Sequence, residues 1–131
     1  MTKRQSGYAD STITVNLDAI VANWRFLDSL SAPSTKTAAM VKANGYGLDS
    51  GAVATALAAA GCPLFFVASL GEAIELRQHF NETGINDMPI MVLHGVQIGQ
   101  EDALAANQLV PVLNDLEQIS RWRLFANKTG I

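Results

Sequence analysis

One lysine, Lys42, stands at the end of a short apolar run, where a strand of a parallel sheet would end. The run covers residues 38–41, and the turn that follows, residues 43–47, contains two glycines. In an α/β barrel the active site lies at the carboxyl ends of the strands. A primary amine in that place can attack a carbonyl group and form an imine. The residue types and their spacing therefore indicate covalent chemistry on Lys42, although a lysine at a strand end is otherwise most often solvated.

The turn after Lys42 has features of an anion site. Gly45 and Gly47 allow tight or left-handed backbone conformations. Asp49 or Ser50 then caps a helix, whose first N–H groups have no partner within the helix. We expect that such a helix start can hold an anion, for example a phosphate.

Strands and helices alternate along the rest of the chain. Four apolar runs predict strands, and each is followed by a segment that reads as a helix. The runs are residues 38–42, 64–68, 89–93 and 109–113. This alternation predicts a parallel sheet with right-handed crossovers. A complete (β/α)8 barrel needs about 250 residues, and this chain has 131, so we expect an α/β fold with about the first half of a (β/α)8 TIM-type barrel.

A further strand and helix are expected before the first barrel strand. Residues 12–17 alternate polar and apolar side chains, which is typical of a strand with one buried face. Asp18 is the candidate cap of the next helix. Residues 1–11 are polar, and we expect them to form a poorly ordered tail, with residues 12–131 as the barrel portion.

Other polar residues near strand ends have simpler explanations than catalysis. Ser69 and Glu72 have the spacing of a capping box, which explains Glu72 better than acid–base chemistry does. His94 ends a predicted strand on the same side as Lys42, but a lone histidine there is more often structural or solvated.

Composition restricts the class of protein. The net charge of −3 gives no argument for nucleic acid or an anionic membrane as partner. No apolar run is long enough to span a bilayer, and the N-terminus lacks the apolar segment of a secretory signal. The single cysteine, Cys62, cannot form an internal disulfide. We expect a cytoplasmic protein, and no metal, since no cluster of Cys, His and carboxylates has ligand spacing.

Residues 41–47 carry a family resemblance. Their sequence, Val-Lys-Ala-Asn-Gly-Tyr-Gly, resembles the pyridoxal-phosphate attachment motif of alanine racemases, isomerases that interconvert L- and D-alanine. Gly45 stands where the family usually has alanine, and Leu48-Asp49 replaces its common His-Gly. Segments that resemble the family's flanking strands and helices follow in the same order, at residues 15–20, 66–68, 72–77, 90–93 and 110–113.

The resemblance implies a role for each site residue. Lys42 would form an imine with pyridoxal 5'-phosphate and, once freed by substrate, would move the α-proton of D-alanine. Tyr46 would donate a hydrogen bond from its hydroxyl group to the cofactor phosphate. The second acid–base group, in this family, is a tyrosine from the C-terminal domain of the other subunit, and Tyr8 in the polar tail is a poor substitute. Arg77 and the other helical arginines match no cofactor motif.

The resemblance also implies a biological setting. Such enzymes are homodimers with an N-terminal barrel and a C-terminal β domain, and they supply D-alanine for peptidoglycan in the cell wall. This chain resembles the N-terminal portion alone, so we interpret it as truncated, acting on a small amino acid.

Two alternatives stay open. The chain can be part of a racemase for another amino acid in the same cofactor class. It can also be an inactive fragment that binds cofactor weakly or only self-associates. Charged residues make up only 16% of the chain, and a half barrel leaves open strand edges and an uncovered apolar face, which favours self-association.

Overall fold

A computed structural model describes residues 11–131, so the expected tail lies outside the described residues apart from Ser11. Four parallel strands form one sheet in the order β1-β2-β3-β4. The strands are β1 (Ala39–Met40), β2 (Phe65–Val67), β3 (Ile90–Val92) and β4 (Leu109–Pro111). The helices are α1 (Leu17–Ser29), α2 (Lys42–Tyr46), α3 (Ser50–Ala59), α4 (Leu70–Thr83), α5 (Glu101–Ala106) and α6 (Leu116–Thr129). The prediction of an α/β fold with a half-barrel arrangement is confirmed.

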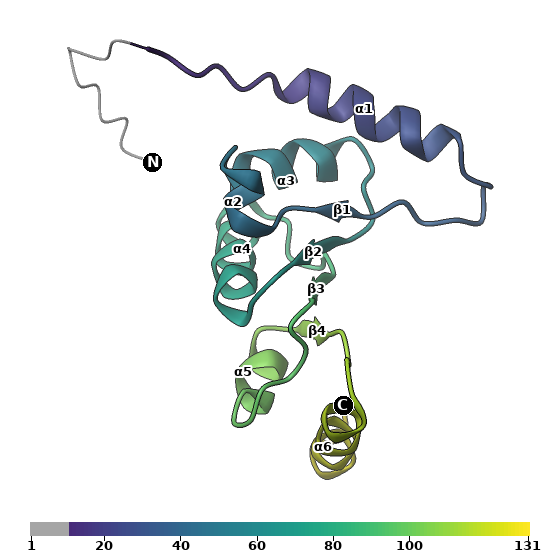
Figure 1. Cartoon of the computed structure of the whole chain (residues 1–131), viewed down its shortest axis with the longest axis vertical. Coiled ribbons are helices and arrows are strands. Elements are labelled where there is room, and N and C mark those ends of the chain that lie inside the picture. The colour runs from purple at the N-terminus through teal and green to yellow at the C-terminus, as the bar shows by residue number, and fades with distance from the viewer. Residues whose placement is uncertain (1–10) are drawn as a thin grey trace.

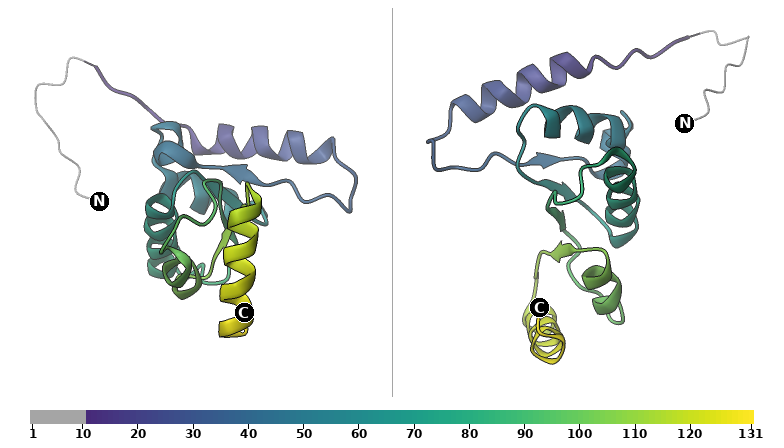
Figure 2. Two further views of the ribbon diagram at one scale, coloured as in Figure 1. Left: turned by 60° about the horizontal axis from the view of Figure 1, so that its bottom comes forward. Right: turned by 180° about the vertical axis from the view of Figure 1, so that it is seen from behind.

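The first and last helices, α1 and α6, lie at opposite ends of the sheet. α1 packs on α3 beside β1, and α6 lies beyond β4 (Figures 1 and 2). Because all four strands are parallel, their carboxyl ends share one side of the sheet, the side that carries α2 in Figure 1. We call this side the carboxyl edge and the opposite side the amino edge.

The two faces of the sheet have different environments. Residues of one face are buried against helices: Ala39, Val41, Phe65, Val67, Ile90, Val92, Leu109 and Pro111. The strand register places one apolar residue per strand in a single row on the other face: Met40, Phe66, Met91 and Val110. We call these four residues the inner row. The side chains at its two ends, Met40 and Val110, remain 37% and 42% exposed.

The strand expected at residues 12–17 does not form. Residues 11–16 have no regular structure, and α1 begins at Leu17. Asn16, rather than Asp18, is the N-cap, because its side-chain oxygen accepts a hydrogen bond from the N–H of Ala19 at 3.0 Å. A strand needs a neighbouring strand to pair its backbone groups, and the described part of the chain offers none here.

The amino edge is held together by Arg77 of α4, which is only 4% exposed. Its guanidinium donates hydrogen bonds of 2.9 to 3.1 Å to four backbone carbonyl oxygens, those of Asn86, Met88, Asn107 and Gln108. Burial lowers the pKa of Arg77 from its ordinary value, and the charge of Asp87 partly opposes this effect. Arg77 therefore ties together the segments that enter β3 and β4.

Candidate active site

Lys42 lies at the carboxyl end of β1, at the place that the sequence predicts. The N–H of Val41 donates a hydrogen bond to the carbonyl oxygen of Phe66 at 2.9 Å, which joins the end of β1 to β2. Lys42 follows as the first residue of α2 and is half-buried. Its backbone is thus held by the sheet on one side and by α2 on the other.

α2 and the glycine after it form one turn of left-handed helix. Residues 43–47 all have positive φ angles, between 52° and 82°. Three of them, Ala43, Asn44 and Tyr46, are not glycine, and a left-handed conformation costs such residues about 1–2 kcal/mol each. The sequence predicted this conformation only from the two glycines. A strained segment of this kind persists only where its surroundings hold it in place.

Two side chains hold the far end of this turn and the start of α3. The Oδ1 atom of Asn44 accepts a hydrogen bond from the N–H of Ser50 at 3.0 Å. The Oδ1 atom of Asp49 accepts one from the N–H of Ala52 at 3.1 Å and caps α3, as predicted. These N–H groups already have acceptors, and a carboxylate lies where the anion was expected. These two hydrogen bonds do not support the expected phosphate site at the start of α3, which stays a prediction.

The near end of the turn is held by Glu72 of α4. Its Oε1 atom accepts a hydrogen bond from the N–H of Ala43 at 2.9 Å, across 29 positions in sequence. Its Oε2 atom accepts from the N–H groups of Ala68 at 2.8 Å and Ser69 at 3.4 Å. Ser69 in turn accepts from the N–H of Glu72, which confirms the predicted capping box. The bond to Ala43 was missed, because the capping pattern describes only local contacts.

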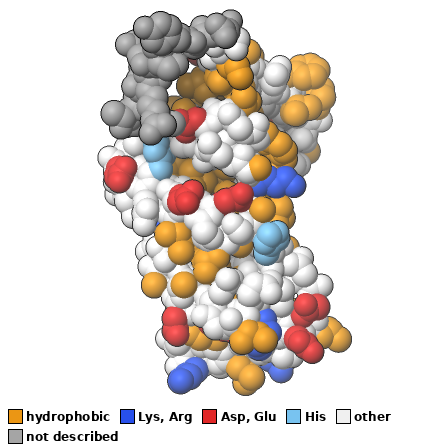
Figure 3. All heavy atoms as spheres, turned by 60° about the vertical axis from the view of Figure 1, so that its left-hand side comes forward, with side chains coloured by type: hydrophobic (Ala, Val, Ile, Leu, Met, Phe, Trp, Pro, Cys, Tyr) orange, Lys and Arg blue, Asp and Glu red, His pale blue; other side chains and the backbone are white. Residues whose placement is uncertain are grey.

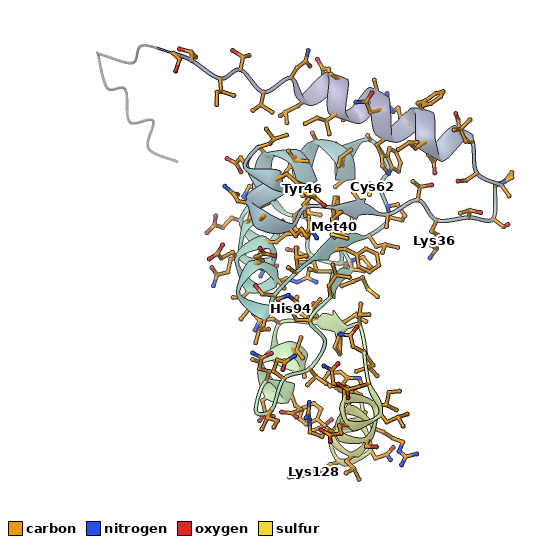
Figure 4. All side chains as sticks on the ribbon, in the orientation of Figure 1. Lys36, Met40, Tyr46, Cys62, His94 and Lys128 are labelled. Atoms are coloured by element: carbon orange, nitrogen blue, oxygen red, sulfur yellow. The ribbon has the colours of Figure 1, made fainter. Side chains whose placement is uncertain are left out.

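Neutral side chains join the carboxyl ends of β3 and β4. Gln118 of α6 is 6% exposed; its Oε1 atom accepts from the N–H of Asn114 at 3.1 Å, and its Nε2 atom donates to the carbonyl oxygen of His94 at 3.2 Å. The Asn114 side chain donates to the carbonyl oxygen of Leu93 at 2.8 Å. The His94 side chain is exposed on the carboxyl edge (Figure 4), and these contacts use its backbone alone.

Tyr46 is the last residue of α2, the short helix that Lys42 begins, and it is labelled in Figure 4. Its side chain is 61% exposed, so its hydroxyl group is free to donate to a bound molecule. The turn therefore presents a primary amine, which reacts with carbonyl groups, and a hydroxyl donor suited to an anion. Both groups belong to the same short turn at the carboxyl edge. Tyr8 lies outside the described residues.

The surface near this edge carries side chains of mixed character. Acidic, basic and hydrophobic side chains are interspersed on the face shown in Figure 3. Within residues 11–131, no three His, Cys, Asp or Glu side chains gather in a way that could hold a metal ion. None of the helices described here has the length and hydrophobicity to cross a membrane.

Comparison with known sequences points to one group of proteins. The family described as "Alanine racemase, N-terminal domain" matches residues 15–131. Alanine racemase from Brucella ovis is 42% identical over 122 residues, which are 93% of this chain and 30% of that protein. The catabolic alanine racemase of Agrobacterium fabrum is 40% identical over 128 residues, 98% of this chain and 32% of that protein. The chain thus spans about a third of the length of these relatives.

A solved structure agrees with the sequence comparisons. The crystal structure of alanine racemase from Bartonella henselae, with covalently bound pyridoxal phosphate, superposes with a TM-score of 0.80 and 37% sequence identity. The match covers 88% of this chain and 31% of that chain. The half-barrel arrangement is therefore similar to one part of a longer enzyme.

Proposed function

The chain belongs to the alanine racemase family, and from this premise we propose that it carries the cofactor lysine of a pyridoxal-phosphate-dependent enzyme that interconverts L- and D-alanine. The observation that carries the proposal is the position of Lys42, which lies at the carboxyl end of β1 and begins a turn that also presents Tyr46. The pyridoxal phosphate bound covalently in the Bartonella henselae enzyme supports the choice of cofactor.

Two residues of this chain would hold the cofactor. Lys42 would bind it through its amine, and Tyr46 would donate a hydrogen bond from its hydroxyl group to the phosphate. When bound, the cofactor supplies an electron sink for the negative charge that develops at the substrate α-carbon. The free amine of Lys42 would take the α-proton from D-alanine or return it there.

Racemisation needs a second acid–base group on the opposite face of the α-carbon. The chain has two tyrosines, and one of them, Tyr46, is already used for the phosphate. We propose that a second subunit supplies the group, in a homodimer of the kind that the family resemblance implies. The cytoplasm as location, and D-alanine for peptidoglycan as the biological product, belong to the same proposal.

Self-association is supported by the sheet itself. Among the described strands, β1 and β4 each pair on one side only, and the inner row stays partly exposed. Unpaired strand edges and apolar patches favour contact with another chain. Sedimentation at micromolar concentration should show a dimer or larger species, and a monomer there would argue against this part of the proposal.

Proton exchange in D2O tests the role of Lys42 without requiring the second acid–base group. With pyridoxal phosphate present, the chain should exchange the α-proton of D-alanine for deuterium faster than that of L-alanine, because Lys42 serves one face. Lys42→Arg should abolish the difference, since its guanidinium cannot take the place of the amine. Equal exchange of both enantiomers, or a difference that persists in Lys42→Arg, would contradict the proposal.

A further inference from the structure

We propose that Glu72 is a positioning residue for Lys42, which it holds through the peptide group between Lys42 and Ala43. The inference rests on the proposed cofactor role of Lys42. Its basis is the hydrogen bond of 2.9 Å from the N–H of Ala43 to the Oε1 atom of Glu72. That N–H belongs to the first peptide group after Lys42, so the carboxylate acts one residue away from the reactive amine.

The contacts of Glu72 go beyond what a helix cap requires. A capping box needs one bond back to the N-cap residue, here Ser69, and that bond is the longest of the three at 3.4 Å. The two shorter bonds, of 2.9 and 2.8 Å, reach Ala43 after β1 and Ala68 after β2. The carboxylate therefore lies between two loops of the carboxyl edge and uses a separate oxygen for each.

The bond fixes a backbone angle next to Lys42. Rotation of the peptide group between Lys42 and Ala43 would change ψ of Lys42 and φ of Ala43 together. Ala43 has a φ of 52°, a conformation that a non-glycine residue leaves unless it is held. A hydrogen bond to a charged acceptor is comparable in strength to the cost of that conformation. Without Glu72, the turn should relax and Lys42 should sample other directions.

Four variants separate positioning from capping and from charge. Glu72→Gln keeps the size of the side chain but has one acceptor oxygen in place of two. Glu72→Asp keeps the negative charge, but its side chain is shorter, so the carboxylate should no longer reach the N–H of Ala43. Ser69→Ala removes the other half of the capping box and leaves the bond to Ala43 possible. Glu117→Gln removes the same charge from the first turn of α6, where Glu117 is exposed.

Amide hydrogen exchange of the chain without cofactor tests the contact directly. Glu72→Gln should speed exchange at Ala43 by about tenfold, because its single neutral amide oxygen is a weaker acceptor than a carboxylate oxygen and can serve only one of the two loops. Ser69→Ala and Glu117→Gln should leave the Ala43 rate unchanged. An unchanged rate at Ala43 in Glu72→Gln would overturn the proposal.

Labelling with pyridoxal phosphate and borohydride tests the consequence for Lys42. The readout is the labelling rate of Lys42 divided by that of Lys128, an exposed lysine of α6 (Figure 4). Glu72→Gln and Glu72→Asp should lower this ratio by about tenfold, the size expected for one charge-assisted bond, while Ser69→Ala should keep it.

The outcomes separate this inference from the proposed function. A high ratio in the unmodified chain that persists in Glu72→Gln would overturn the positioning role alone. An equal fall of the labelling ratio in Ser69→Ala and Glu72→Gln would show that Glu72 acts only as part of the helix cap. That result would also overturn the positioning role. No preference for Lys42 in the unmodified chain would overturn the proposed cofactor role itself.

Discussion

The two edges of the sheet are held by charged side chains of the same helix, α4, but the charges have opposite sign. At the carboxyl edge, Glu72 accepts hydrogen bonds from the N–H groups of the loops that leave β1 and β2. At the amino edge, Arg77 donates to carbonyl oxygens of the segments that enter β3 and β4. The direction of the chain explains the difference. Loops that leave the strands lead into helix N-termini, which have free N–H groups, whereas loops that enter them follow helix C-termini, which have free carbonyl groups.

The two edges also differ in what they leave exposed. Arg77 is 4% exposed and all its named partners are backbone atoms, so the amino edge contributes to stability. The carboxyl edge keeps a left-handed turn and the exposed Tyr46, which is 61% accessible. The comparison teaches that this fold places the proposed chemistry at one edge and a buried stabilising contact at the other. Three variants test this division, beginning with the largest expected effect.

Arg77→Met should lower the free energy of unfolding by about 3 kcal/mol, because four carbonyl oxygens lose their donor in a buried place. Urea denaturation followed by circular dichroism measures the change. Arg123→Met on α6, where the side chain is exposed, is the matched control and should change stability by less than about 0.5 kcal/mol. A similar decrease in the free energy of unfolding in both variants would contradict the claim that the hydrogen bonds of Arg77 stabilise the amino edge.

Gly95→Ala should cost about 2 kcal/mol at the carboxyl edge, because a Cβ atom there would overlap both the Gln118 side chain, which joins β3 to β4, and the backbone carbonyl oxygen of Val112. Gly99→Ala is the control. Gly99 has a similar φ, 81° against 71°, but a Cβ atom on it would meet no atom within 4 Å. Because the backbone cost of alanine is similar at the two positions, the difference between the two variants in the free energy of unfolding, measured by urea denaturation, reports the cost of the overlap. Equal losses of unfolding free energy would show that the close packing around Gly95 does not contribute to stability.

Cys62 should make a small contribution that depends on pH. Burial raises the pKa of its thiol above the ordinary value of 9.0, against the weaker lowering effect of the Leu64 backbone. The unfolded thiol therefore loses its proton first, so stability present below pH 9.0 is lost as pH rises towards the folded pKa. From about pH 8 to about pH 10, the unmodified chain should lose up to about 1 kcal/mol more than Cys62→Ala. If the free energies of unfolding of the unmodified chain and of Cys62→Ala changed in parallel with pH, in thermal or urea unfolding, this prediction would be contradicted.

The sequence predicted the parts of the fold that depend on local pattern. Apolar runs bounded by turn residues located all four strands, and Ser69 with Glu72 and Asp49 were identified as helix caps. The position of Lys42 followed because a strand end needs only the run and the turn beside it.

What the sequence did not predict depends on partners far along the chain. The alternation at residues 12–17 resembles a strand, but pairing decides whether one forms. The second oxygen of Glu72 meets Ala43 across 29 positions, and Arg77 reaches residues up to 31 positions away. The left-handed conformation of Ala43 also opposes its intrinsic preference, so no local rule indicates it.

The most direct test of the cofactor site is where pyridoxal phosphate attaches to the unmodified chain. The chain is mixed with the cofactor, reduced with borohydride, digested, and analysed by mass spectrometry. We predict rapid, saturable labelling of Lys42, with little labelling of the exposed Lys36 and Lys128. Labelling spread evenly over the exposed lysines would contradict the claim that the carboxyl edge of this sheet forms a cofactor site.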